Sequence, residues 1–391
     1  MYDLVAYEMM LADAVRTDAY LAAIAGTVRP GDVVVEIGTG VGYFAVAAVR
    51  AGARHVYAIE TNPVITLGPA VAEANGCADR ITFMAADSRR VSVPELGDVL
   101  LADLRGMLPL AGHNIPSIID ARERLLKPDA RFVSIRDILW ASPVELGAVH
   151  ARHYLAADSA RYGIRRDPVE RAARSFLSRL AIERSELLAA PATWGSIDFP
   201  TVTSPDVVGV AEWTVDRGGR VDGIGVWFDA ELGSGAGISN APGTPVTSYG
   251  RGLLPLRSSV EVDAGDRIRV ALRAKLVDAD YIFGWDTTVE PADDRRNRVF
   301  MRQSTLDTLL LRPEQLRRRR SDHRPQLGES TRVLADLIAL ADGSRSFAEI
   351  ARRLRERHPD TFRTDKDALH FATERSAALE DGDLPADPTL G

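Results

Sequence analysis

Short apolar runs alternate with amphipathic segments along the first 145 residues. Runs of aliphatic and β-branched residues predict buried strands at 32–37, 55–60, 80–84, 98–102 and 131–135. Apolar residues at helical spacing predict helices at 9–21, 44–51, 64–75 and 115–126. Repeated strand–helix units form a parallel sheet with helices on both faces. We therefore expect a Rossmann-like, doubly wound α/β domain over residues 1–145.

The pattern changes between residues 146 and 303. Alternating positions predict short strands at 207–215, 223–232, 258–262 and 267–276, separated by Gly, Pro, Asn and Ser. Many short strands with turn residues between them indicate an antiparallel sandwich or barrel. A helical stretch at 169–187 precedes these strands, and we interpret it as part of an inserted arm.

Residues 304–391 return to helical patterns. The segment 317–320 is four consecutive arginines, which we interpret as a solvated connector. Ser346 and Glu349 have the spacing of a capping box at the start of the second of three helices. The helices are predicted at 331–341, 347–357 and 366–379. Three helices in so short a region indicate a small helical or winged-helix module.

Composition and charge narrow the class of protein. A chain of 391 residues is expected to form about two or three domains. Its net charge of -7 argues against a general nucleic-acid-binding protein, which needs surplus cations. The single cysteine, Cys77, excludes an intramolecular disulfide and fits a reducing compartment. Without a signal-peptide pattern or an uncharged apolar run of about 20 residues, a cytoplasmic protein with no membrane span is expected.

The turn after the first predicted strand contains three glycines, Gly38, Gly40 and Gly42. Glycine at such a strand-to-helix turn lets the backbone approach a ligand closely. Glu60 ends the next strand, where a carboxylate can accept hydrogen bonds from both hydroxyls of a ribose. Asp87 and Ser88 end the strand after that and could meet an adenine edge. Together these positions predict an adenosine-binding site.

The acid before this turn, Glu36, distinguishes two cofactor classes. A dinucleotide places its diphosphate on the helix N-terminus, and its turn typically has the form GxGxxG, whereas this turn has the form GxGxG. The Glu36 carboxylate would repel a diphosphate but can accept the ammonium group of a methionine moiety. We therefore expect S-adenosylmethionine as cofactor and S-adenosylhomocysteine as product.

Three segments around these positions, 9–20, 33–60 and 75–87, resemble the protein arginine methyltransferase family. They are similar to the family's first helix, its cofactor motif and the strand that follows. The resemblance implies that Arg16 pairs with the methionine carboxylate and that Met10 packs near the cofactor. It also assigns the ribose to Glu60.

The second region also resembles this family, through residues 223–245, 254–256 and 262–270. The resemblance implies a β-barrel over residues 146–303. It further implies a dimerisation arm at about 155–190 and a homodimer.

The part of the site that would bind the methyl acceptor, here called the acceptor side, departs from the family's pattern. The family binds guanidinium with two glutamates on the loop after the fourth strand. Asp103 stands at the first of these positions, and the second falls at 112–113, which holds no acid. Arg105 adds a cation to the loop. The family's Thr-His-Trp loop corresponds to residues 247–249, with neither His nor Trp, so a plain arginine guanidinium is disfavoured as the acceptor.

Four residues are candidates for the acceptor chemistry: Asp103, Arg105, His113 and Tyr249. Methyl transfer is an in-line displacement that needs a positioned nucleophile and often a base. Asp103 or His113 would take the proton. Arg105 would orient a carboxylate or amide of the acceptor.

Residues 337–362, with their flanking helices, resemble PqqD-like peptide-recognition domains. Such domains bind the leader of a ribosomal precursor peptide by strand addition. The resemblance therefore implies a peptide partner for the module at 304–391. An ordinary helical cap or a DNA-binding winged helix fits the same pattern.

From these features we predict an S-adenosylmethionine-dependent methyltransferase that modifies a peptide or a peptide-derived natural product. Three alternatives fit the same sequence features. The enzyme could be an arginine N-methyltransferase or a small-molecule N- or O-methyltransferase. It could also be an inactive methyltransferase fold that serves as a peptide-binding scaffold, although a scaffold has no need of a complete set of cofactor residues.

Overall fold

The computed structural model describes residues 4–147, 163–165, 167–308, 317–318 and 321–375. The chain divides into two compact units, Met1–Leu310 and Leu311–Gly391. The first unit contains both the predicted α/β domain and the predicted antiparallel domain. Within the described residues no helix is long and apolar enough to cross a membrane.

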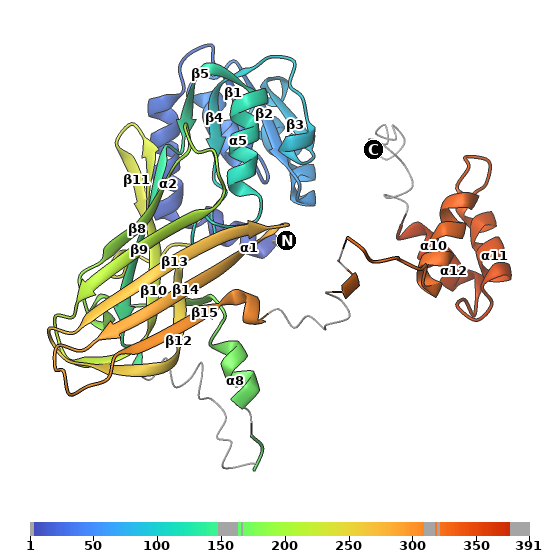
Figure 1. Ribbon diagram of the computed structural model, residues 1–391. Helices are drawn as coiled ribbons and strands as arrows, with labels where there is room; N and C mark the ends of the chain where they lie inside the picture. The colour runs from blue at the N-terminus through green and yellow to red at the C-terminus, as the bar shows by residue number, and fades with distance from the viewer. Residues whose placement is uncertain (1–3, 148–162, 166, 309–316, 319–320, 376–391) are drawn as a thin grey trace. The chain divides into compact units, whose positions relative to one another are not determined.

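A five-stranded sheet with the order β3-β2-β1-β4-β5 organises the first part of the chain (Figure 1). All its neighbouring strands run parallel, which confirms the predicted doubly wound arrangement. The central strand β1 is buried along its whole length, as its run of aliphatic residues predicts. The strands are β1 (Val33–Ile37), β2 (His55–Glu60), β3 (Ile81–Ala85), β4 (Gly97–Ala102) and β5 (Leu126–Val133).

Helices connect and flank these strands. The predicted first helix is in fact two, because the Asp13 side chain accepts a hydrogen bond from the Arg16 backbone N–H and caps a new helix. The helical elements are α1 (Leu4–Leu11), α2 (Ala14–Thr27), α3 (Tyr43–Arg50), α4 (Gly68–Ala74) and α5 (Asn114–Arg124), with short 3-10 turns η1 (Pro63–Leu67), η2 (Ala78–Arg80) and η3 (Ser88–Arg90). Strand β5 begins earlier than predicted, since an edge strand tolerates the proline at 128.

Antiparallel strands follow in two sheets, one with the path β7-β12-β10-β6-β8 and the other with β15-β14-β13-β9. The short strand β11 pairs with β10. The strands are β6 (Arg136–Val144), β7 (Ser178–Leu180), β8 (Ala192–Asp198), β9 (Val207–Thr214), β10 (Gly219–Gly233), β11 (Ala236–Ser239), β12 (Arg251–Val262), β13 (Arg267–Val277), β14 (Asp280–Glu290) and β15 (Val299–Ser304).

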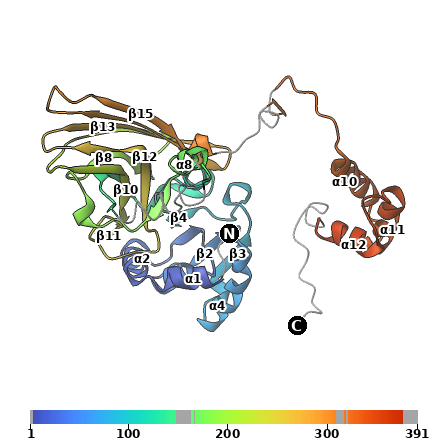
Figure 2. The same cartoon turned by 90° about the horizontal axis from the view of Figure 1, so that it is seen from below.

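The two antiparallel sheets lie as neighbouring layers in Figure 2. Among the described residues no hydrogen-bonded ladder joins one sheet to the other. The region therefore forms two antiparallel sheets, which fits the predicted sandwich, and the described strands do not close into a single barrel sheet. They meet where β8 passes β9: a Cβ on Gly209 would lie 1.6 Å from the Trp194 carbonyl oxygen. At this crossing the backbones of β8 and β9 touch, and the two strands form no regular hydrogen-bonded ladder.

The predicted arm at 155–190 is only partly described, because residues 148–162 and 166 lie outside the described residues. The continuous helix predicted at 169–187 is wrong. Helix α8 spans only Asp167–Ala173, and the chain then forms β7, which pairs with β12, and a 3-10 turn η4 (Arg184–Glu186). Backbone hydrogen bonds between β7 and β12 therefore stabilise a strand in a stretch whose residue pattern predicted a helix. The homodimer stays a prediction.

The C-terminal unit contains three described helices, as predicted: α10 (Glu329–Leu340), α11 (Phe347–Arg357) and α12 (Asp365–Thr373). The capping box of Ser346 and Glu349 is confirmed. The unit has its own apolar core, which includes Val333, Leu337 and Leu354. Between residues 321 and 375 there is no strand, so this stretch offers no sheet edge for the strand addition that a PqqD-like domain implies. The predicted end of the last helix, 376–379, lies outside the described residues.

A final 3-10 turn of the first unit is η5 (Thr305–Thr308).

Candidate active site

The glycine turn lies between β1 and α3, at the point where the order of the parallel sheet reverses, which is where open α/β sheets bind ligands. Gly38, Gly40 and Gly42 all have positive φ, +80°, +58° and +84°. A Cβ on Gly38 would lie 2.8 Å from Leu104, and one on Gly42 would lie 2.7 Å from Phe83. The backbone conformation and the crowding both require glycine here.

Tyr7 of α1 packs over this turn, a contact that the sequence analysis missed. Its hydroxyl donates to the Thr39 carbonyl at 3.4 Å and accepts from the Val41 N–H at 3.2 Å. A Cβ on Gly40 would lie 2.2 Å from the Tyr7 hydroxyl oxygen. Burial raises the pKa of Tyr7 to about 12, so its hydroxyl remains a donor at physiological pH. The first helix thus covers the glycine turn.

Two carboxylates flank the turn, as predicted. Glu36 is buried and accepts a 2.7 Å hydrogen bond from the Thr39 hydroxyl. Burial raises the pKa of Glu36 to about 8, so the side chain can take up a negative charge when a cation arrives. Glu60 accepts from the Gly40 N–H at 3.2 Å and from the Asn62 N–H at 2.8 Å. These contacts hold the Glu60 carboxylate against the glycine turn.

Asp87 and Ser88 follow β3, at the same edge of the sheet. The Asp87 carboxylate accepts two hydrogen bonds from the Arg89 guanidinium, which lower the pKa of Asp87 to about 2. Ser88 is buried, and its carbonyl accepts from Arg124 at 3.0 Å. Asp87 is therefore an anion with a local partner, and contact of either residue with adenine stays a prediction.

Asp103 follows β4 and is the centre of the acceptor side. Arg16 Nε and Nη2 each lie 2.6 Å from Asp103 Oδ2. The Tyr249 hydroxyl lies 2.9 and 2.8 Å from the two carboxylate oxygens. Burial opposes the charge on Asp103, but Arg16 and Arg105 outweigh it and hold the pKa of Asp103 below its usual range. Arg16 also donates to the Met10 carbonyl at 3.3 Å, so five of the predicted site residues, Arg105 included, meet here.

Arg105 is bound within the protein by a residue that the sequence analysis did not single out. Its Nε and Nη2 lie 2.8 and 2.7 Å from the two oxygens of Asp137 on β6. Its Nη1 donates to the Tyr20 hydroxyl at 2.5 Å and lies 3.5 Å from Asp103 Oδ1. Nearly all its N–H groups are therefore used, which conflicts with the predicted role of Arg105 in orienting an acceptor.

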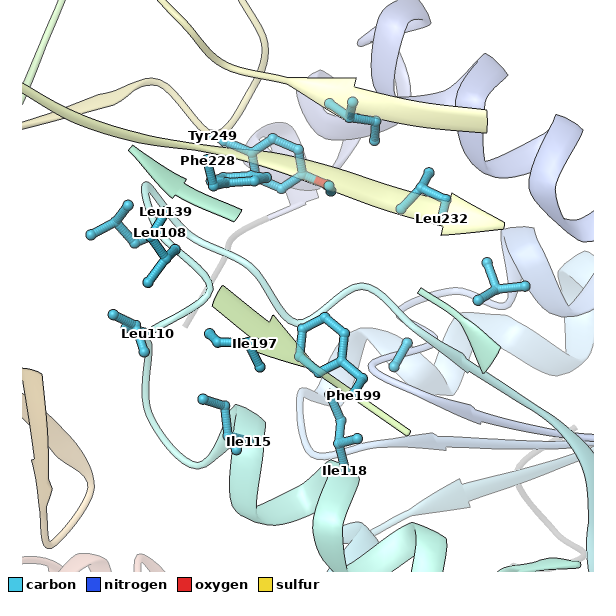
Figure 3. Packing of buried hydrophobic residues seen from close by; sticks show 14 of the residues in the cluster. Leu108, Leu110, Ile115, Ile118, Leu139, Ile197, Phe199, Phe228, Leu232 and Tyr249 are labelled. Atoms are coloured by element: carbon cyan, nitrogen blue, oxygen red, sulfur yellow. The ribbon is translucent and has the colours of Figure 1, made fainter. Parts of the chain in front are cut away.

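The loop from Asp103 to His113 closes onto α5 and the apolar core. The Asn114 side-chain amide donates to the Leu104 carbonyl. Figure 3 shows Leu108 of the loop beside Leu139, and Leu110 lower on the loop towards Ile115 of α5, all of them buried. A small hollow of about 10 Å³, lined in part by Leu104, Arg105 and Phe199, lies near the loop.

His113 ends this loop, in the N-cap position of α5. Its side chain is half-buried, and among the described residues it forms no hydrogen bond. Tyr249 reaches the site from the loop before β12, and Figure 3 shows its ring against Phe228, with the ring centroids 5.3 Å apart. His113 therefore has no fixed partner, whereas Tyr249 is held by Asp103 and Phe228.

The cofactor-binding region is similar to a known methyltransferase domain. A family model, the TRM5/TYW2 methyltransferase domain, matches residues 14–108. The arginine N(omega)-methyltransferase of Streptomyces achromogenes subsp. streptozoticus is 30% identical over 282 residues, which cover 67% of this chain and 74% of that protein. This chain belongs to the arginine methyltransferase family. It is an S-adenosylmethionine-dependent methyltransferase.

Two further relatives within the arginine methyltransferase family match about two thirds of this chain. The probable histone-arginine methyltransferase CARM1 of Oryza sativa subsp. indica is 27% identical over 282 residues, which cover 66% of this chain. The chain spans about half of that relative, 52% of its length. Protein arginine N-methyltransferase 6 of Xenopus tropicalis is 25% identical, over 68% of this chain and 82% of its own.

Solved structures of the family share the fold. The Trypanosoma brucei PRMT1 enzyme–prozyme complex with AdoHcy has a TM-score of 0.68 at 19% identity and covers 76% of this chain and 97% of its own. Protein arginine methyltransferase 10 of Arabidopsis thaliana has a TM-score of 0.67 at 20% identity, over 77% and 97%. The glycine turn and the Glu36 and Glu60 carboxylates are suited to hold S-adenosylmethionine in this chain.

Proposed function

We propose that this methyltransferase modifies a peptide or peptide-derived molecule at an uncharged nucleophilic group, and that a plain arginine guanidinium is not its acceptor. The observation that carries the proposal is the state of Asp103, the single acid between residues 103 and 113. Both its oxygens already accept hydrogen bonds, from Arg16 and from Tyr249. A guanidinium that entered the site would find no free carboxylate on this loop.

The same contacts favour an acceptor that needs no strong base. When bound, S-adenosylmethionine supplies a methyl group on a positively charged sulfur. Asp103 is a weak base, because Arg16 and Arg105 hold its pKa low. An uncharged amine attacks with its own lone pair, the electrons of the broken carbon–sulfur bond return to sulfur, and the new ammonium then loses a proton to water. A hydroxyl acceptor would instead need His113 as its base.

The peptide part of the proposal rests on the C-terminal unit. This unit has its own core and is separate from the unit that carries the cofactor site. Helix α11 exposes Arg352 and Arg353, which suit an acidic segment of a peptide. A methyltransferase for small molecules would have no evident use for such a unit.

Arginine methylation is the second candidate, and membership of the family favours it. The Streptomyces relative, 30% identical, is named an arginine N(omega)-methyltransferase. For this chain to bind a guanidinium through Asp103, Arg16 and Tyr249 would have to release that carboxylate. The two candidates therefore differ in a measurable way, the charge of the preferred acceptor.

A panel of short peptides tests the choice between them. Each peptide carries one candidate acceptor, which is an α-amine, a serine hydroxyl or an arginine, with all other amines acetylated. The assay runs at about pH 9, where most of the α-amine is uncharged and the arginine is not. We expect release of S-adenosylhomocysteine to be at least about tenfold faster with the amine peptide than with the arginine peptide, a difference of ~1.4 kcal/mol in the barrier. Faster turnover of the arginine peptide would reject the proposal and support the second candidate.

Ending the chain after Leu310 tests the role of the C-terminal unit. We expect the truncated protein to bind S-adenosylhomocysteine within about twofold of the full chain, because the two units have separate cores. Turnover of a leader-bearing precursor peptide should fall by about tenfold, since a tethered binding site raises the effective concentration of a substrate. A short acceptor peptide without a leader is the control and should react equally with both proteins. Equal turnover of the long peptide by both proteins would remove the peptide-recognition idea.

A further inference from the structure

The pair of Arg105 and Asp137 is the most buried ion pair of the first unit's acceptor side. The exposed fractions of the two side chains are 2% and 0%. The guanidinium lies bidentate on the carboxylate, at 2.8 and 2.7 Å. Such planar two-point contact is the strongest way in which a protein binds a guanidinium.

The surroundings of Arg105 complete a guanidinium-binding box. The Phe199 and Phe228 rings lie 5.6 and 5.8 Å from the Arg105 guanidinium carbon, within the range of cation–π contacts. The Tyr20 hydroxyl accepts a hydrogen bond from Nη1 at 2.5 Å. Carboxylates, aromatic rings and a hydroxyl are the groups that would receive the arginine of a substrate. Here the protein's own arginine occupies them.

A chain of hydrogen bonds ties this box to the base of the acceptor loop. The Tyr20 hydroxyl lies 3.3 Å from the Ser134 hydroxyl, and Ser134 donates to the carbonyl of Ala102, the last residue of β4. Asp103 is the next residue. Asp137 binds Arg105, and Arg105 is linked through Tyr20 and Ser134 to the residue before Asp103. Asp137 therefore helps to hold the segment that carries the Asp103 carboxylate.

The charges of the four ionised side chains on the acceptor side sum to zero without a substrate. Arg16 and Arg105 contribute two positive charges, and Asp103 and Asp137 contribute two negative charges. A cationic acceptor would add an uncompensated charge to a buried site that also has to hold a positively charged sulfur. Like charges at such short range and low dielectric repel strongly.

We infer that Arg105 acts as a built-in guanidinium that selects against cationic acceptors, and that Asp137 is the positioning residue that holds it there. The inference rests on the proposed function and deepens it, because it names the class of acceptor as uncharged and assigns that choice to two residues. It predicts that the preference of the site for an uncharged over a cationic acceptor changes when the net charge of Arg105 and Asp137 changes.

Equilibrium binding to the full-length protein saturated with S-adenosylhomocysteine tests this inference without any turnover. The two probes are N-acetyl-arginine amide and N-acetyl-citrulline amide, which have nearly the same shape and differ by one charge. We expect the wild type to bind the citrulline probe at least as tightly as the arginine probe. Arg105→Leu should shift the ratio of the two dissociation constants by about tenfold towards arginine, because it leaves two carboxylates with one arginine.

Three further variants separate charge from structure. Arg105→Lys keeps the cation, and Arg105→Leu/Asp137→Leu removes both charges, so both should keep the wild-type ratio. Asp137→Asn leaves an extra positive charge and should shift the ratio about threefold or more away from arginine, and this nearly isosteric change carries the test if Arg105→Leu does not fold. A wild type that prefers arginine, or a ratio that is the same in all variants, would overturn the inference. This experiment measures binding alone. If no peptide is methylated in the turnover assays, that result would therefore contradict the proposed function but would leave the binding result for Arg105 and Asp137 intact.

Discussion

Replacing Asp137 by leucine is expected to lower the free energy of unfolding by about 3–5 kcal/mol, because it strands the Arg105 guanidinium in the core. Arg105 is 2% exposed, and its only other carboxylate contact within the described residues is at 3.5 Å, to an Asp103 that is already shared with Arg16. Urea denaturation followed by circular dichroism measures the change. A destabilisation of this size is a large fraction of the stability of an ordinary domain.

The control for this prediction is the double variant Arg105→Leu/Asp137→Leu. Replacing a whole buried ion pair by apolar residues is often close to neutral, so the double variant should recover most of the loss and lie within about 1–2 kcal/mol of the wild type. Equal loss in the single and double variants would mean that the leucine at 137 fails to pack, and that the ion pair is not the source of the effect.

Replacing Glu60 by alanine is expected to weaken the binding of S-adenosylhomocysteine by at least about tenfold. We expect the Glu60 carboxylate, at the end of β2, to accept the ribose hydroxyls, and hydrogen bonds to a charged acceptor contribute about 1.5–3 kcal/mol each. Its contact with the Gly40 N–H, at 3.2 Å, also braces the glycine turn. Isothermal titration calorimetry gives the dissociation constants.

Glu60→Gln is the matched variant for this second prediction. It keeps an oxygen for the Gly40 N–H but loses the charge, so it should lie between the wild type and Glu60→Ala. A wild type that binds no S-adenosylhomocysteine would remove the central assignment of the cofactor. Equal binding by all three proteins would instead show that another residue receives the ribose.

Membership of the arginine methyltransferase family and the chemistry of the acceptor side lead in different directions. Solved structures of the family share the fold, and the Streptomyces relative is similar over 67% of the chain. The acceptor side has one acid on its loop, and that acid is neutralised by Arg16 and Arg105. The groups that touch an acceptor decide which acceptor binds, so shared family membership does not by itself fix the acceptor of this chain.

The elements of the cofactor half follow from local sequence. The strands β1 and β2 lie almost where their apolar runs predict them, and the three glycines of the turn have the positive φ that their residue type permits. A buried parallel strand, a glycine turn and an acid at a strand end each depend on a few neighbouring residues. Pattern analysis therefore finds them. Tyr7 escaped because its partner, the Val41 N–H, lies 34 positions away.

The antiparallel region was harder to predict for a related reason. The strands β9 and β13 show a clear alternation, but the pairing of strands depends on contacts between distant segments. No local pattern distinguishes a closed barrel from two open sheets. The helical pattern at 169–187 was misleading because ladder bonds between β7 and β12 decide the structure of that stretch.

By itself, the sequence determined the parallel sheet, the methyl donor and the three C-terminal helices, because these depend on short-range periodicity and on motifs that keep their residues together. Only the tertiary structure decided the acceptor side. There Asp103 meets Tyr249 from 146 positions away, and Arg105 meets Asp137 from 32. The charge on a buried carboxylate depends on which cations surround it, and only the folded chain brings those cations together.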